Sequence, residues 1–177
     1  MKRPILILAA AMMMSGSVAY SQALNAPVVA HPDPESLFTS PDPKLNTNKQ
    51  AALGIMKVLL EAGHWERASE FLTQQYIQHN PVASSGRDAV VHYFVDIAKV
   101  QPKPIPARLQ TRVVAVQAEG DYVTVSQVRE LPEPKDPSKK YTTTWFDMWR
   151  FKDGKADEHW DPMTLPTAPP PAAPAAN

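Results

Sequence analysis

The sequence contains no cysteine, and this absence excludes several kinds of site at once. Without thiols the chain can form no disulfide bond, no thiolate zinc site, no thiolate-held iron–sulfur cluster and no cysteine nucleophile. An excess of one charge is also missing, because 18 basic residues balance 18 acidic residues over the 177 positions. Proteins that bind nucleic acids usually carry a basic surplus, so we expect no nucleic-acid partner.

Glycine is scarce, and no glycine-rich phosphate loop, dinucleotide-binding fingerprint or nucleophile elbow occurs. The apolar run at residues 5–14 is too short to span a bilayer as a mature helix. Basic residues 2–3 precede it, and residues 21–23 offer small side chains for cleavage. This pattern predicts a secretory signal over residues 1–23 that is cleaved after Ala23, with an uncleaved anchor as the alternative. We expect a periplasmic or secreted chain that has no membrane partner after cleavage.

Eighteen of the nineteen prolines lie after the predicted signal and divide the rest of the chain. Proline breaks helices and sheet ladders, so its clusters mark segments outside regular structure. The cluster in residues 24–46 predicts a linker, and the Ala/Pro-rich residues 163–177 predict a disordered tail. Two further clusters, at 101–106 and 132–137, predict loops. The folded domain is therefore expected at residues 47–162.

The spacing of apolar residues changes near Pro106 from a helical period to a period of two. Three helices are predicted before this point, over residues 47–62, 64–73 and 85–99. Four strands are predicted after it, over residues 108–118, 122–131, 140–151 and 155–161. Helices followed by a run of strands predict an α+β fold, with the helices on one face of a curved antiparallel sheet.

The Lys-Asp-Gly-Lys turn at residues 152–155 allows two registers for the last hairpin. A two-residue loop would pair Lys152 with Lys155. A three-residue loop, with Gly154 in the left-handed region, would pair Phe151 with Lys155. We favour the three-residue loop, because its first two residues suit the right-handed helical region.

In this register Asp147 lies opposite His159, and Trp145 lies opposite Asp161. Alternation along the strands then places one set of side chains on a common face: Tyr141, Thr143, Trp145, Asp147, Trp149, His159 and Asp161. Carboxylates and an imidazole in an apolar cleft are typical of general acid–base catalysis. Alternatively, the His–Asp pair is a cross-strand bond and the tryptophans are core residues. The other register would send His159 and Asp161 to the opposite face.

Candidate residues outside the hairpin lie near Pro81. His79 and Asn80 could reach the same cavity, or Asn80 could only shape the turn. Tyr76 could line the pocket with its hydroxyl or pack in the core. A metal site made of His79, His159 and the two aspartates lacks the close ligand spacing of known metal motifs, so we expect no metal.

Two segments resemble the SnoaL-like family of the nuclear-transport-factor-2-like (NTF2-like) superfamily. Residues 76–81, YIQHNP, followed by Gly86, resemble the first family segment. Residues 147–151, with Gly-Lys at 154–155 and EHWD at 158–161, resemble the second segment, D-x-x-R…GK…EHWD. The two segments occur in the family's order, and this combination is fairly specific.

The resemblance covers about residues 50–162 and implies a particular fold. That fold is an NTF2-like cone, in which three N-terminal helices pack on a strongly curved antiparallel sheet that encloses a pocket. Characterised SnoaL-like cyclases close a polyketide ring by intramolecular aldol condensation without a cofactor. This resemblance implies that Asp161 is the acid–base carboxylate, that Asp147 assists it in catalysis, and that His79 lines the cavity. Homodimers are common in the superfamily.

These observations together predict an exported acid–base enzyme of the cyclase, isomerase or dehydratase type. Its substrate would be a small, largely apolar carbonyl compound, and it would need no cofactor. Asp161 would remove a proton next to the carbonyl, and His159 or Asp147 would tune this carboxylate. His79 or a tyrosine hydroxyl would steady the enolate oxygen. The predicted pocket-lining residues are His79, Tyr76, Trp145 and Trp149. The alternative is a non-catalytic periplasmic ligand-binding or accessory module with the same pocket.

Overall fold

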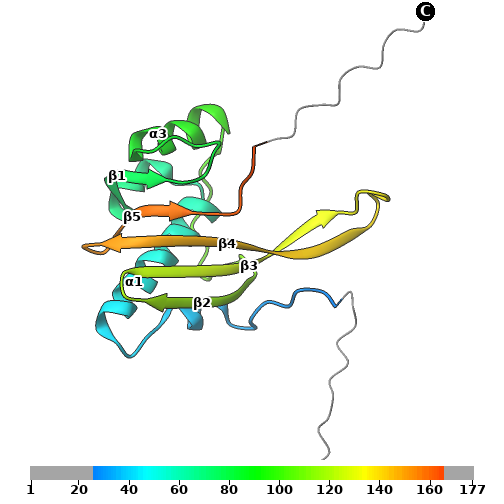
Figure 1. Cartoon of the computed structure of the whole chain (residues 1–177), viewed down its shortest axis with the longest axis horizontal. Coiled ribbons are helices and arrows are strands. Elements are labelled where there is room, and N and C mark those ends of the chain that lie inside the picture. The colour runs from blue at the N-terminus through cyan, green and yellow to red at the C-terminus, as the bar shows by residue number, and fades with distance from the viewer. Residues whose placement is uncertain (1–25, 166–177) are drawn as a thin grey trace, which may run out of the picture.

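The computed structural model describes residues 26–165, which form helices packed on one face of a five-stranded sheet (Figure 1). The strands are β1 (Leu72–Gln78), β2 (Val113–Glu119), β3 (Tyr122–Pro132), β4 (Lys140–Lys152) and β5 (Lys155–Trp160). The helical elements are η1 (Pro34–Phe38), α1 (Pro43–Gly54), η2 (Ile55–Glu61), η3 (Trp65–Arg67), α2 (Ala68–Phe71), α3 (Arg87–His92) and η4 (Tyr93–Ile97). Since η2 continues α1, α2 continues η3, and η4 continues α3, the chain has three helical units besides the short η1. Strand β1 lies between the second and third units, and the other four strands follow, so the α+β prediction is confirmed.

The sheet has the order β1-β5-β4-β3-β2 and is open rather than closed. The prediction of an antiparallel sheet is only partly right, because β1 runs parallel to β5, with Gln78 beside His159. The reason is topological: β1 leaves the helical layer and joins the edge of the sheet next to the last strand. This arrangement brings the end of β1 alongside the end of β5 (Figure 1).

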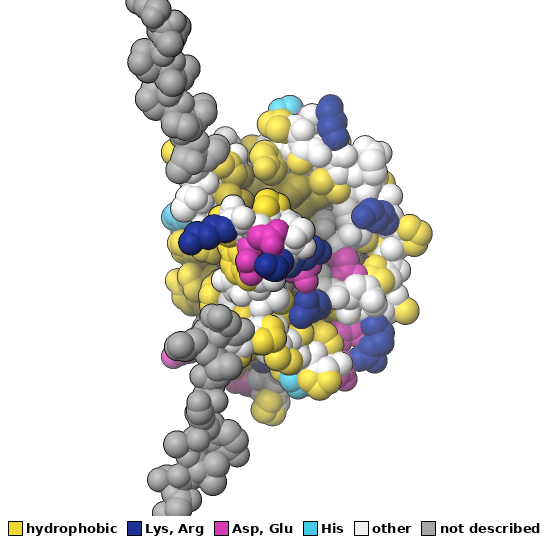
Figure 2. All heavy atoms as spheres, turned by 90° about the vertical axis from the view of Figure 1, so that its right-hand side faces the viewer, with side chains coloured by type: hydrophobic (Ala, Val, Ile, Leu, Met, Phe, Trp, Pro, Cys, Tyr) yellow, Lys and Arg dark blue, Asp and Glu magenta, His cyan; other side chains and the backbone are white. Residues whose placement is uncertain are grey.

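The β3–β4 hairpin is the longest in the sheet and projects beyond the rest of the domain (Figure 1). Its tip faces the viewer in Figure 2, where charged side chains gather on it beside apolar surface. Two ion pairs account for part of this charge, Lys139 with Asp136 and Lys140 with Glu130. Because the tip pairs its charges internally, the hairpin can extend into solvent without exposing an uncompensated cluster.

The hydrophobic core lies between the helices and the sheet. Its largest fully buried side chains are Trp149, Phe38, Met56, Leu59, Leu72, Val90, Val113, Val123 and Val125. None of the helices within residues 26–165 has the length and apolarity that a bilayer span requires. The secretory signal predicted over residues 1–23 and residues 166–177 of the predicted tail lie outside the described part of the chain.

The proline-rich segment that we expected to be a linker packs against the domain. Phe38 is fully buried, and the backbone N–H of His31 donates to the carbonyl of Val113 at the edge of the sheet. The first helix begins at Pro43 rather than at residue 47, because Asp42 caps it. The Asp42 carboxylate accepts the N–H of Leu45 at 2.9 Å, and proline suits the first turn of a helix.

Glu35 fastens this segment to the domain through two bonds. Its carboxylate accepts Lys57 Nζ at 2.8 Å and the backbone N–H of Leu109 at 2.7 Å. These hydrogen bonds, chiefly the one from Lys57, hold the pKa of Glu35 below its ordinary value. Because the folded state favours the ionised carboxyl group, Glu35 stabilises the fold at pH values above the pKa that it has in the unfolded chain. This stabilisation is lost as the pH falls through the pKa of Glu35 in the folded state.

The Glu35→Gln variant is therefore expected to be less stable than the wild type by about 1–2 kcal/mol at pH 7. The difference should shrink as the pH falls below the ordinary glutamate range, because both proteins then carry an uncharged side chain. Urea unfolding at several pH values measures this, with Glu119→Gln, an exposed residue at the end of β2, as the control. A difference that stays constant down to pH 3 would show that the ionised form of Glu35 is not the stabilising one.

The turn of the β4–β5 hairpin differs from our expectation. Asp153 and Gly154 both have positive φ, at 51° and 74°, and Lys152 pairs with Lys155. The loop therefore has two residues, and the three-residue prediction is wrong. A two-residue turn of this kind has the twist of the flanking strands, and aspartate tolerates the left-handed conformation better than most residues.

A β-bulge then restores the face that the two-residue turn would have reversed. Phe151 pairs with Ala156, but Arg150 pairs with Glu158, so Asp157 is the extra residue. The Asp157 carboxylate accepts Arg150 Nη2 at 3.0 Å and Thr73 Oγ1 at 2.8 Å, which holds the bulge in place. From this point on, the residues of β5 return to the face on which we expected them.

The predicted partner of His159 is wrong by two residues along β4, since His159 lies opposite Trp149 rather than Asp147. The predicted face is nevertheless the one observed, because the bulge shifts the register by one residue. Five residues of the predicted face line a common cavity: Trp145, Asp147, Trp149, His159 and Asp161.

Candidate active site

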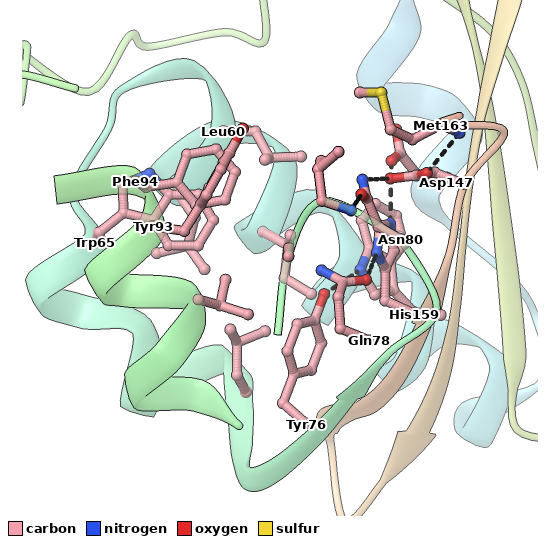
Figure 3. Close-up of a pocket in the computed structure, with 18 of the residues that line it drawn as sticks. Leu60, Trp65, Tyr76, Gln78, Asn80, Tyr93, Phe94, Asp147, His159 and Met163 are labelled. Atoms are coloured by element: carbon pink, nitrogen blue, oxygen red, sulfur yellow. Dashed lines mark hydrogen bonds and ion pairs between the residues drawn. The ribbon is translucent and has the colours of Figure 1, made fainter. Parts of the chain in front are cut away.

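A cavity of about 220 Å³ lies between the helices and the inner face of the sheet (Figure 3). One end is apolar and is lined by Leu59, Leu60, Trp65, Val90, Tyr93 and Phe94. The other end is polar and is lined by Gln78, Asn80, Asp147, His159 and Asp161. In Figure 3 the labelled members of the two groups lie on opposite sides of the cavity, with Leu60, Trp65, Tyr93 and Phe94 on one side and Gln78, Asn80, Asp147 and His159 on the other. A ligand that fits this cavity would have an apolar body and one polar end.

The imidazole of His159 is buried and held from both sides. Its Nε2 lies 3.1 Å from Asp147 Oδ1, and its Nδ1 lies 2.5 Å from Gln78 Oε1. The ring also stacks on Trp149, with 5.4 Å between the ring centroids. Both ring nitrogens therefore face side-chain oxygen atoms, and these two contacts fix the orientation of the ring.

Asp147 is buried as deeply as His159, and each is 6% exposed. Its Oδ2 accepts Gln127 Nε2 at 2.6 Å, and its Oδ1 accepts Trp145 Nε1 at 3.4 Å besides the contact with His159. Hydrogen bonds of this kind satisfy a carboxylate that has been taken out of water. These bonds hold the Asp147 carboxylate in one orientation beside the imidazole.

Asp161 is the more accessible of the two pocket aspartates, being half-buried. Its Oδ2 accepts Asn80 Nδ2 at 2.7 Å, and its Oδ1 accepts the backbone N–H of Met163 at 2.8 Å. Asn80 itself is fixed by the N–H of Val82, which donates to its Oδ1 at 2.9 Å. The carboxylate of Asp161 is thus oriented by two hydrogen bonds while it still lines the cavity.

Asp147, His159 and Asp161 each offer one potential metal ligand, and these ligand atoms lie within 4.8 Å of one another. A divalent cation would need an unprotonated ring nitrogen, so His159 would have to release the bond to Asp147 or to Gln78. The carboxylates also receive N–H donors from Asn80 and from other neighbours. The residues therefore permit a cation, but each of them already forms hydrogen bonds with neighbouring side chains.

Tyr76 adds a hydroxyl to the cavity. Trp149 Nε1 donates to this oxygen at 3.2 Å, so the hydroxyl can direct its own proton elsewhere. Burial raises the pKa of Tyr76, and the hydroxyl stays protonated at neutral pH. Tyr76 is therefore a hydrogen-bond donor that could meet an oxygen atom of a ligand.

His79 does not line the cavity, and its prediction as a pocket residue is wrong. Its Nε2 lies 2.7 Å from Glu158 Oε1, and its ring stacks on Trp160 with 4.8 Å between the centroids. Alternation along β1 is the reason, because Tyr76 and Gln78 point inward and His79 then points outward. The sequence reasoning missed Gln78, although its spacing of two residues from Tyr76 could have identified it.

Gln127 was missed for a different reason. It lies in the middle of β3, opposite Trp145 on β4, and only this pairing brings its amide to Asp147. No motif surrounds it in the sequence. Trp145 and Trp149 lie where they were expected, on the wall of the cavity, and Tyr76 lies there too.

A family model described as "SnoaL-like domain" matches residues 56–159, which is more than half of the chain. This chain therefore belongs to the SnoaL-like family, as the two sequence segments predicted. The match includes Asp147 and His159 and ends two residues before Asp161.

Several solved structures resemble this fold at low sequence identity. A candidate polyketide cyclase from Bacillus cereus ATCC 10987 is 17% identical, with a TM-score of 0.49 over 77% of this chain and 84% of the other. A candidate SnoaL-like polyketide cyclase from Jannaschia sp. CCS1 is 19% identical, with a TM-score of 0.47 over 70% and 91% of the two chains. An NTF2-like protein of unknown function from Burkholderia pseudomallei K96243 is 16% identical, with a TM-score of 0.46 over 67% and 91%. Among curated proteins no match to this chain is found.

Proposed function

We propose that this chain is an acid–base enzyme that needs no cofactor and acts on a small, largely apolar carbonyl compound. The observation that carries the proposal is the polar end of the cavity. There an accessible carboxylate, Asp161, lies beside the buried Asp147–His159 pair, and both face a space that is otherwise apolar. Membership of the SnoaL-like family supports the same class of chemistry.

The proposed reaction begins with removal of a proton from the carbon next to the carbonyl. An Asp161 oxygen takes this proton, and the electron pair of the broken C–H bond moves into the carbonyl group to form an enolate. The hydroxyl of Tyr76 donates a hydrogen bond to the enolate oxygen. In an isomerisation the enolate is conjugated with a C=C bond, and Asp161 delivers the proton to a different carbon of this system while the carbonyl re-forms and the C=C bond shifts. In an aldol step the enolate carbon instead attacks a second carbonyl, whose oxygen receives the proton.

The Asp147–His159 pair is proposed to act through position and charge. The polar imidazole, fixed next to Asp161, favours the negative charge that develops on the substrate. The apolar wall strengthens this effect, because electrostatic interactions are stronger where water is excluded. Gln78 and Gln127 hold the pair in one orientation through the bonds described above. His79, which we expected as the alternative to a tyrosine hydroxyl at the enolate oxygen, is outside the cavity and has no part in this mechanism.

A non-catalytic ligand-binding module remains the second candidate. One observation favours it: both oxygens of Asp161 already accept hydrogen bonds, as they would in a carboxylate that only shapes the cavity. The two candidates differ in whether bound ketones exchange protons.

The test is α-proton exchange in D₂O, followed by proton NMR on a panel of aryl ketones and 1,3-dicarbonyl compounds. We expect the protein to accelerate the exchange of at least one panel member. The Ala83→Trp variant should abolish this effect, because Ala83 lines the cavity and a large ring there fills it. Ser84→Trp is the matched control, since Ser84 is exposed and is not among the residues that line this cavity. Panel compounds that bind without exchange would favour the binding module.

A further inference from the structure

A shallow groove of about 320 Å³ adjoins the cavity at the base of the projecting hairpin. Its walls are Gln127, Val128, Arg129, Trp145 and Met163. Trp145 and Met163 also line the cavity, so the groove continues the cavity outward. A ligand longer than the cavity would emerge along this path.

Arg129 is the charged residue of this groove. Its guanidinium carbon lies 4.3 Å from the centroid of the Trp145 ring, and this stacking places the group above the wall that the groove and the cavity share. Within residues 26–165 neither Arg129 nor Arg112 forms an ion pair, whereas the other four arginines do so: Arg67, Arg87, Arg108 and Arg150. A guanidinium held by stacking keeps its N–H groups available for a partner from solution.

The charge inside the cavity determines where an anionic group can lie. The side chains that line the cavity include Asp147 and Asp161 but no lysine or arginine. A carboxylate that entered the polar end would meet two like charges and only one imidazole. The same carboxylate placed in the groove would meet the planar fork of Arg129, which can bind two oxygens at once.

We propose that Arg129 forms an anion subsite at the mouth of the cavity. The ligand would then have an apolar, ring-sized body inside and a carboxylate, sulfonate or similar anion outside. This proposal rests on the cavity of the proposed function, but it concerns binding and does not depend on turnover. It names a substrate class, an apolar carbonyl compound with an acidic end, and one residue that selects it.

A pair of fluorescent probes tests the subsite. 8-Anilinonaphthalene-1-sulfonate and N-phenyl-1-naphthylamine have the same rings, and only the first carries an anion. We expect the wild type to bind the sulfonate more tightly, and Arg129→Gln to weaken that binding about tenfold, as loss of one charged hydrogen-bonded contact does. The affinity for the neutral probe should stay unchanged. Arg129→Lys should retain part of the preference, since the charge remains but the fork does not.

Arg112→Gln is the matched control, because it removes the same charge from an exposed residue that does not line the groove. Ala83→Trp should weaken both probes, which locates them in the cavity. An unchanged sulfonate affinity in Arg129→Gln would overturn the subsite, and so would an equal loss for both probes. If the wild type bound neither probe, both the anion subsite and the use of the cavity as a ligand site would be rejected. If no ketone exchanged protons but the wild type still bound the sulfonate more tightly than the neutral probe, only the catalytic proposal would be rejected.

Discussion

Replacing Asp161 with asparagine is expected to lower the rate of α-proton exchange by about 100-fold or more, the usual contribution of a general base. The amide has the size of the carboxylate and can still accept the N–H of Met163. It cannot take up a proton near neutral pH. The loss should therefore appear in the rate and leave the affinity for the ketone nearly unchanged. Exchange NMR on the responsive panel ketone, with its dissociation constant from titration, measures both quantities.

Asp153→Asn is the control for this substitution. Asp153 lies in the β4–β5 turn with positive φ, a conformation that asparagine adopts readily, so this variant should keep the wild-type rate. Thermal unfolding of both variants verifies that the fold is intact. Wild-type exchange in Asp161→Asn would reject Asp161 as the base and, with it, the proposed mechanism.

Replacing Phe38 with alanine is expected to destabilise the domain by about 3–5 kcal/mol. Phe38 has no exposed surface, and it packs in the core with residues of the first helix and the sheet. Truncating the ring leaves a cavity that a well-packed core cannot close. Urea unfolding measures the change in the free energy of unfolding. We expect the loss of stability although Phe38 lies in a segment that was predicted to be a linker.

Val29→Ala is the matched control, since Val29 comes from the same segment but is 74% exposed. Its effect should stay within about 0.5 kcal/mol, as is usual for surface substitutions. A loss below about 1 kcal/mol for Phe38→Ala would mean that the segment is dispensable for the fold, contrary to its buried position.

The linker prediction shows the limit of composition as a guide. Proline argues against helices and strands, but it does not prevent a segment from packing. Here the prolines coexist with Phe38, with Glu35 and with a helix whose cap and first residue are Asp42 and Pro43. Each of these is visible in the sequence, yet the surface that receives Phe38 is made by residues far along the chain.

The last hairpin was predicted correctly in its face and incorrectly in its pairing. The residues 152–155 allow two turns of similar quality, so local chemistry could not choose between them. The bulge at Asp157 could not be predicted either, because it is held by Arg150 and by Thr73, a residue of a different strand. The inward orientation of His159 is a result of both features together.

The sequence alone determined the class of the fold, the family and the polar cluster on the last two strands. It could do so because hydrophobic period, turn residues and short motifs depend on neighbours along the chain. Tertiary structure decided that β1 lies beside β5, that Gln78 and Asn80 rather than His79 enter the cavity, and that Gln127 and Arg129 line the groove at its mouth. These outcomes depend on strand order and register, which are set by packing between segments up to about half the chain apart, and no local pattern encodes them.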